Sequence, residues 1–177
     1  MNTAHAMSHH PEPTEYPPYY EKYVSLVPPG EIMTTLEQQL DQTLAVLRSI
    51  PEAQGNSRYA PDKWSIKELI GHLTDTERIF AYRALRFARH DQTPLSSFEQ
   101  DDYVREAAFD ACQLTDLVAE FEHVRRANLY LFRHLAPAAW LRRGVANKGE
   151  VSVRALAYII AGHERHHLEI LKTRYLS

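Results

Sequence analysis

The stretch LAYIIAGHERHHLEIL, Leu156–Leu171, carries apolar residues and two histidines on one helical face. Its apolar residues recur at spacings of three and four, the period of an amphipathic α-helix. At about 100° per residue, His163 and His167 both fall within about 20° of Leu156, in the middle of the apolar stripe. Burying two imidazoles is costly unless their nitrogens have partners. The stretch therefore predicts a core helix over about 152–175 that carries a buried polar site.

Three earlier stretches show the same period, over residues 31–50, 65–89 and 113–135. The second of them opens with Ser65 and Glu68, the spacing of a helix capping box. No stretch alternates apolar and polar residues, so no strand is predicted. Four amphipathic helices of this length predict an all-α fold, a four-helix bundle.

The connection between the second and third helices, residues 91–112, is long and acidic and includes a short helix predicted over about 101–106. It is long enough to carry the chain the length of the bundle. We therefore expect a crossover that makes the second and third helices parallel.

The first thirty residues differ from the rest because they hold six of the ten prolines. Proline at this density forbids a regular helix. We predict an arm over residues 1–30 and a bundle domain over 31–177. Within the arm, residues 1–15 are predicted to be a mobile tail, and residues 19–27 a short helix or extended segment lying on the domain.

Composition excludes several classes of protein. The chain has 177 residues and a net charge of −3, which gives no electrostatic reason to expect nucleic acid. No run approaches the roughly 20 apolar residues that cross a bilayer. A polar, proline-rich N-terminus does not resemble a secretory signal, and the single cysteine, Cys112, fits a reducing compartment. We expect a cytoplasmic protein that binds neither nucleic acid nor a membrane.

The histidine pair has two interpretations. An i, i+4 pair brings two nitrogens within reach of one ion, as in helical zinc sites; alternatively, both rings are core histidines hydrogen-bonded to their neighbours. A third ligand has to come from another helix, where His72 is the first candidate and Asp75 the second. Glu164 completes a literal HExxH with His163 and His167, but only ten residues follow, too few for the downstream ligand of a zinc protease. Glu164 is either a general base or an exposed helix carboxylate.

Other polar residues interrupt the apolar stripes. Glu77 on the second helix and Arg125 on the third are predicted to pair across the bundle, or to line a pocket, because an isolated buried charge is costly. Asn128 is a candidate to line a cavity beside the metal; the alternative is a satisfied core amide. The basic side of the second helix is predicted to be a solvated face, formed by Arg78, Arg83, Arg86 and Arg89.

Three blocks resemble a known family. They are KWSIKELIGHLTDTERIF (63–80), PLSSFEQDDYV (94–104) and AGHERHHLEILKTRY (161–175). Together they resemble the DinB-like superfamily of four-helix-bundle proteins, which is related to bacillithiol and mycothiol transferases, over about residues 30–177. The resemblance implies a homodimer in many cases, and a zinc or nickel ion held by the residues matching the family's ligands, His72, His163 and His167. In the transferase branch it implies that the metal activates a low-molecular-weight thiol.

The loop block places Tyr103 where it could reach over one mouth of the bundle and contact a bound molecule; the alternative is an ordinary acidic loop. Three histidine ligands leave coordination positions open, which is typical of a catalytic metal site. The first functional hypothesis is therefore a metal-dependent thiol S-transferase acting on a small molecule. The alternatives are a metal-dependent hydrolase of a small substrate, a non-catalytic metal- or ligand-binding stress-response module, and a metal-free bundle with packed histidines.

Overall fold

The computed structural model describes residues 9–177 and shows the expected bundle of four long helices. These are α3 (Ile32–Arg48), α4 (Ile66–Ala88), α6 (Leu114–Arg133) and α7 (Val153–Ile170). A short π-helical segment, Leu171–Tyr175, continues α7. Their bounds lie within a few residues of those that the apolar periodicity predicts. Among the described residues, no helix is long and apolar enough to span a bilayer.

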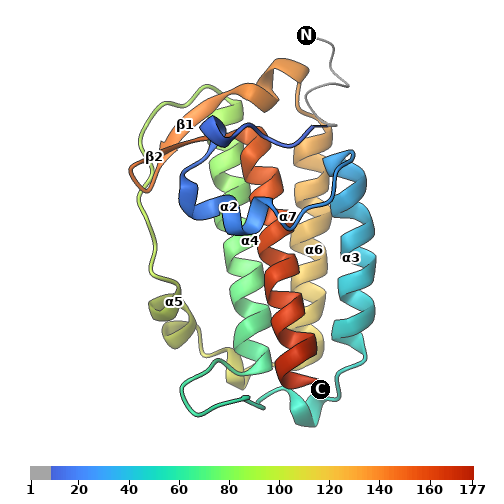
Figure 1. Ribbon diagram of the computed structural model, residues 1–177. Coiled ribbons are helices and arrows are strands. Elements are labelled where there is room, and N and C mark those ends of the chain that lie inside the picture. Colours follow the sequence, from blue (N-terminus) through green and yellow to red (C-terminus); the bar gives the residue numbers. More distant parts are fainter. Residues whose placement is uncertain (1–8) are drawn as a thin grey trace.

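The order of the helices confirms the crossover. In Figure 1, α4 and α6 run in the same direction, and α3 and α7 run in the opposite one. After α4 the chain returns along the outside of the bundle, through the short helix α5 (Gln100–Ala107), before α6 begins. Helix α4 packs between α6 and α7, and α3 lies diagonally across from it.

The start of α4 is fixed by the predicted capping box. The Ser65 hydroxyl accepts a hydrogen bond from the Glu68 backbone N–H at 3.1 Å, and the Glu68 carboxylate accepts one from the Ser65 backbone N–H at 2.7 Å. Both bonds satisfy amides that the helix itself leaves unpaired. His72 therefore lies about two turns inside a well-defined helix.

Helix α7 is the central element of the fold. Every residue from Val153 to Glu164 is buried, as expected for a helix that has neighbours on all sides. Helices α3 and α4 cover part of it, and the N-terminal arm covers the rest. His163 therefore lies in the interior, whereas His166 and His167 are half-buried.

The arm packs more closely than its proline content suggests. As predicted, residues 19–27 lie on the domain, here as the short helix α2 (Glu21–Val24) against α7. This contact requires Gly162, because a Cβ there would lie 2.0 Å from the carbonyl oxygen of Tyr23. The arm thus crosses α7 directly beside His163.

The prediction of a mobile tail over residues 1–15 is wrong at Glu15. This side chain is buried, and its carboxylate accepts hydrogen bonds from Ser152, at 2.6 Å, and from Arg154. Proline excludes a regular helix but permits the 3₁₀ turn Pro13–Glu15 that brings the carboxylate to Arg154. Residues 1–8 of the predicted tail lie outside the described residues.

The prediction that the chain has no strands is also wrong. Strands β1 (Arg143–Ala146) and β2 (Gly149–Ser152) form an antiparallel hairpin before α7. Its two turn residues, Asn147 and Lys148, both have positive φ, as a tight hairpin turn requires. Four-residue strands are too short to show a clear alternation, and Lys148 replaces the glycine that usually marks such a turn.

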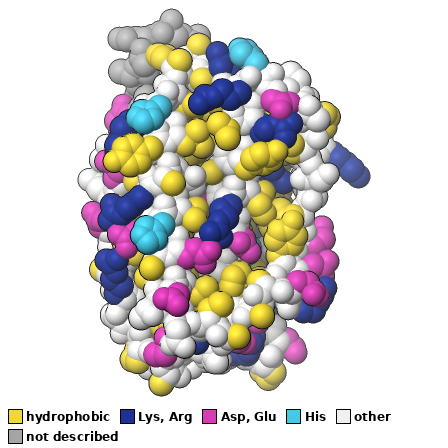
Figure 2. All heavy atoms as spheres, turned by 180° about the vertical axis from the view of Figure 1, so that it is seen from behind, with side chains coloured by type: hydrophobic (Ala, Val, Ile, Leu, Met, Phe, Trp, Pro, Cys, Tyr) yellow, Lys and Arg dark blue, Asp and Glu magenta, His cyan; other side chains and the backbone are white. Residues whose placement is uncertain are grey.

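Surface ion pairs link the helices on their exposed sides. Figure 2 shows acidic and basic side chains interspersed there with scattered apolar ones. Helix α6 is linked to α4 by Arg78 and Glu120, 2.6 Å apart, and to α3 by Arg133 and Glu37, also 2.6 Å apart. Such exposed pairs contribute about 0 to 1 kcal/mol each, so packing rather than charge holds the bundle together.

Candidate metal centre

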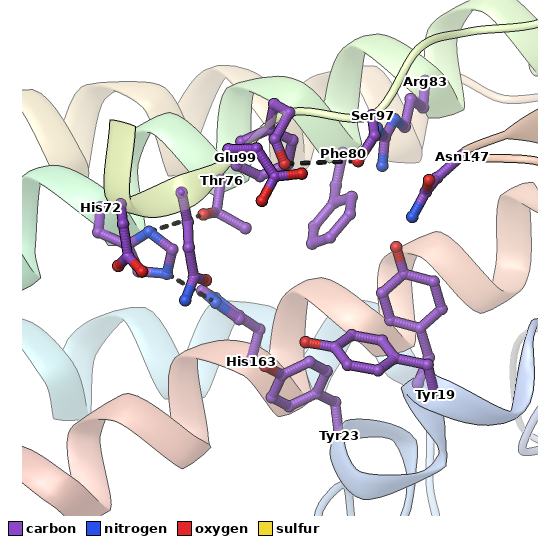
Figure 3. Close-up of a pocket in the computed structure, with 14 residues that line it drawn as sticks. Tyr19, Tyr23, His72, Thr76, Phe80, Arg83, Ser97, Glu99, Asn147 and His163 are labelled. Atoms are coloured by element: carbon purple, nitrogen blue, oxygen red, sulfur yellow. Dashed lines mark hydrogen bonds between the residues drawn. The ribbon is translucent and has the colours of Figure 1, made fainter. Parts of the chain in front are cut away.

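Three histidines from two helices meet in the interior. His72 of α4 and His163 and His167 of α7 each place one ring nitrogen within 4.8 Å of the other two. The Nε2 atoms of His72 and His163 are 3.1 Å apart, and Figure 3 shows these two rings facing each other between the helices. Asp75, the second candidate for the third ligand, lies outside this group and pairs instead with Arg78 at 3.5 Å.

The geometry fits a tetrahedral ion. Zinc–nitrogen bonds of about 2.0–2.1 Å place two ligand nitrogens about 3.4 Å apart, close to the separation between His72 and His163. In the absence of metal, one N–H···N hydrogen bond could join these two rings. That bond would not include His167, which is half-buried and contacts the other two rings edge-on. The three nitrogens together match the donor set of a divalent cation.

Burial keeps the three rings neutral. Loss of solvent lowers the pKa of His72 to about 4. The same loss, helped by the nearby His72, His166 and Lys22, lowers the pKa of His167 to about 2. Burial also holds the pKa of His163 well below its ordinary value. Neutral imidazole is the form that offers a lone pair to a metal, so no proton has to be displaced near pH 7.

Neighbouring side chains orient the rings. The Thr76 hydroxyl, one turn after His72, lies 3.4 Å from its Nδ1, which leaves Nε2 to face the other two histidines. Trp64 packs against His72 with ring centroids 4.6 Å apart, and Tyr23 packs edge-on against His163 at 5.2 Å. Trp64 and Tyr23 were not singled out from the sequence, because only the docking of the arm and of the segment before α4 brings them to the site.

A cavity of about 300 Å³ opens from His72 and His163. Besides His163 of α7, residues of the arm, α4, the crossover and the hairpin lie around it (Figure 3). They include Tyr19, Tyr20 and Tyr23 of the arm, Thr76, Phe80 and Arg83 of α4, residues 97–101 of the crossover and Asn147 of the hairpin. The cavity is therefore large enough for a small molecule and has a strongly polar wall.

A second buried cluster lies next to the histidines. Arg125 of α6 donates from Nε and Nη2 to the two carboxylate oxygens of Glu77 at 2.6 and 2.7 Å, which confirms the predicted pair. Its Nη2 also donates to Glu164 at 2.7 Å, and Gln39 donates to the same Glu164 oxygen. This cluster joins all four helices of the bundle.

Glu164 belongs to this second cluster. Its side chain is 2% exposed, so the expectation of an exposed helix carboxylate is wrong. It does not line the cavity, and its ion pair with Arg125 favours a structural role. Its role as a general base stays a prediction.

Asn128 and Tyr103 do not line the cavity either. The Asn128 amide donates to Glu77 at 3.2 Å, the satisfied amide that was the alternative expectation. Tyr103 is 49% exposed and packs against Phe98 beside a neighbouring hollow. The crossover reaches the cavity through residues 97–101 instead, because α5 turns Tyr103 outward.

The fold and the three-histidine cluster define a class, namely four-helix bundles with parallel second and third helices and a buried candidate metal site. The model of the DinB superfamily matches residues 35–171, and the chain belongs to this superfamily. No curated protein matches the chain.

Among solved structures, the fold is similar to one described as "YfiT from Bacillus subtilis is a probable metal-dependent hydrolase with an unusual four-helix bundle topology". The TM-score is 0.66 with 14% sequence identity, and the match covers 93% of each chain. At this identity the similarity shows the shared fold.

Proposed function

We propose that this protein is a metal-dependent enzyme in which His72, His163 and His167 hold one divalent cation, zinc or nickel, beside the cavity. The observation that carries this proposal is the convergence of three neutral imidazoles, two of them buried and one half-buried, next to a space of about 300 Å³. A closed structural zinc site uses four protein ligands, whereas three leave a position for a reacting molecule.

The proposed reaction is the transfer of a low-molecular-weight thiol to a small electrophilic substrate. Such a cation lowers the pKa of a bound thiol or water and so supplies a nucleophile near neutral pH. Thr76 holds the His72 ring in place, and the Trp64 and Tyr23 rings shield the histidines from water. Kinship with thiol transferases, implied by the sequence blocks around these histidines, favours this reaction.

Hydrolysis of a small substrate is the second candidate, with water in place of the thiol. One observation favours it, namely that the similar Bacillus subtilis structure is described as a probable metal-dependent hydrolase. In both reactions the histidines hold the metal and the cavity holds the substrate. The two candidate functions therefore differ only in the nucleophile, a thiol or water.

The test starts from protein purified without a histidine tag, stripped with a chelator and reloaded with zinc or nickel. Loaded protein should conjugate cysteine to 1-chloro-2,4-dinitrobenzene, or cleave p-nitrophenyl acetate, faster than stripped protein. His167→Ala should abolish the difference, and His166→Ala is the matched control, since His166 is adjacent but lies outside the cluster. If stripped protein stays folded and shows the same rate as loaded protein in both assays, the enzyme hypothesis fails. A non-catalytic metal- or ligand-binding module is then the remaining interpretation.

We also propose that the protein is a homodimer, and this part of the proposal is supported only by the resemblance to the DinB-like superfamily. Light scattering coupled to size exclusion should give twice the chain mass of 20.4 kDa. A mass of one chain across the micromolar range would remove the dimer from the proposal without affecting the metal site.

A further inference from the structure

One buried cation lacks the partner that the others have. Among residues 9–177, the buried lysine and arginine side chains are Lys67, Arg83, Arg125 and Arg154. Three of them pair with a carboxylate, of Glu52, Glu77 and Glu15 respectively. Arg83 is 4% exposed, yet no Asp or Glu of the described chain lies within ion-pairing distance of it. A buried charge without a counter-ion is costly, so the missing carboxylate partner of Arg83 needs a physical explanation.

The groups around Arg83 are neutral. Its Nη2 donates to the Ser96 carbonyl oxygen at 3.0 Å, and its guanidinium also hydrogen-bonds the Tyr20 hydroxyl. Burial raises the pKa of Tyr20, so the phenol stays protonated and does not neutralise the arginine. The guanidinium carbon lies 5.5 and 5.9 Å from the ring centroids of Phe80 and Phe98. These contacts hold the cation in place and leave its charge uncompensated.

Arg83 faces the same cavity as the histidines. Figure 3 shows Arg83 and Asn147 toward one end, His72 and His163 at the other, and Phe80 between them. Eleven residues of α4 separate His72 from Arg83, about 16 Å along the helix axis. A small molecule with one group at each end fits this arrangement.

Two carboxylates also line the cavity, Glu99 and Asp101. Both are exposed, so water screens their charges. The Arg83 guanidinium is buried in a region of low dielectric constant, so its charge is screened less. A single guanidinium beside two rim carboxylates matches a monoanion better than a multiply charged phosphate. A carboxylate also fits the two-pronged donor geometry of arginine.

We infer that Arg83, assisted by the Asn147 amide, forms a carboxylate-binding subsite, and that the molecule turned over here carries a carboxylate at the end remote from its reacting group. The inference rests on the proposed function for the reacting end of that molecule. Binding of the carboxylate by Arg83 needs no metal. An experiment can therefore contradict the carboxylate subsite without contradicting the metal-dependent function, and the reverse.

The first experiment measures the subsite alone. Metal-free protein is titrated by calorimetry with hexanoate and with hexan-1-ol, which have similar apolar chains and differ in charge. Wild type should bind hexanoate at least tenfold more tightly than hexanol, and Arg83→Gln should lose this preference. Arg83→Lys should keep part of it, and Arg78→Gln, an exposed arginine of the same helix outside the cavity, should keep all of it.

Thermal melting separates binding from structure. Because Arg83 neutralises no carboxylate, Arg83→Gln orphans no charge and should melt no lower than wild type. Equal hexanoate binding by wild type and Arg83→Gln, or no preference of wild type for hexanoate, would overturn the subsite.

The second experiment joins the subsite to the metal. Cobalt-loaded protein is titrated with 6-mercaptohexanoate and 6-mercaptohexan-1-ol, and the sulfur-to-cobalt absorption band reports thiolate binding. Wild type should favour the carboxylate thiol at least tenfold, and Arg83→Gln should bind both equally. An absent cobalt band with intact hexanoate binding would overturn the proposed function and leave the subsite standing, whereas an equal band for both thiols in wild type would overturn the inference.

Discussion

Two buried polar clusters lie side by side in this bundle and differ in how their groups are satisfied. Around Arg125, the guanidinium donates to two carboxylates, and each carboxylate also accepts a hydrogen bond from a side-chain amide. Around His72, the neutral rings of His72 and His163 and the nearby Arg83 line a cavity, and the carboxylates of that cavity, Glu99 and Asp101, are exposed. In the first cluster the cation has carboxylate partners within the protein, and the cluster links the four helices. In the second, Arg83 has no carboxylate partner among the described residues and lines a cavity, which marks this region as the place where a molecule from outside binds.

The largest expected effect is on the first cluster. Arg125→Met leaves Glu77 and Glu164 buried without a cation, which should lower the free energy of unfolding by about 3–5 kcal/mol. Urea denaturation measures this. Arg126→Met, at the next position on α6, removes an exposed arginine paired with Glu122 and should change stability by less than about 1 kcal/mol. Equal stabilities of the two variants would mean that the cluster does not hold the helices together.

A smaller effect separates the two clusters directly. Glu164→Gln keeps the shape of the side chain but removes its charge from the Arg125 cluster, so it should cost about 1.5–3 kcal/mol of stability. Metal content per chain should stay unchanged, since the Glu164 carboxylate faces Arg125 rather than the cavity. If this variant keeps its stability and loses its metal instead, Glu164 belongs with the histidines, and the division into two clusters is wrong.

The smallest expected effect on stability is at the ion pair between Glu15 and Arg154, which attaches the arm to the start of α7. Burial opposes ionisation of Glu15, but hydrogen bonds from Arg154, Ser152 and the Glu12 backbone outweigh it and hold the pKa of Glu15 below 4.5. The stabilisation from this pair is therefore complete above about pH 4.5 and is lost as the pH falls through the lower folded-state value.

Comparison with Glu15→Gln isolates this contribution. The unfolding free energy of wild type should exceed that of the variant by about 1 kcal/mol at pH 7, and this gap should close as the pH falls below 4.5. The difference between their unfolding free energies across this range is the measurement. A gap that does not change with pH would show that the Glu15 charge contributes nothing.

Sequence periodicity predicts the bundle well because its helices are long and carry continuous apolar stripes. The capping box at Ser65 and the apolar stripes place all four helices, and the length of the connection after α4 predicts the crossover. The hairpin around Asn147 was missed because its strands are short and its turn lacks glycine. The burial of Glu15 was missed because proline content predicts where helices are absent and says nothing about packing.

The site was predictable where it depends on the position of a residue in the apolar stripe of its helix. Spacing alone puts His163 and His167 on the buried face of α7, and the stripe positions of Glu77 and Arg125 predict their pairing. Arg83 was predicted to be part of a solvated basic face; instead it is 4% exposed, because the crossover and the arm cover that side of α4. Contacts of this kind depend on how distant segments dock, and helical periodicity carries no information about that.

The most direct test of the metal centre is elemental analysis of tag-free protein after loading with zinc or nickel and removal of unbound metal. Wild type and His166→Ala should each hold about one ion per chain, and His163→Ala and His167→Ala should hold less than about one tenth. Folded wild-type protein that retains no metal, or a His167→Ala variant that retains as much as wild type, would contradict the three-histidine centre.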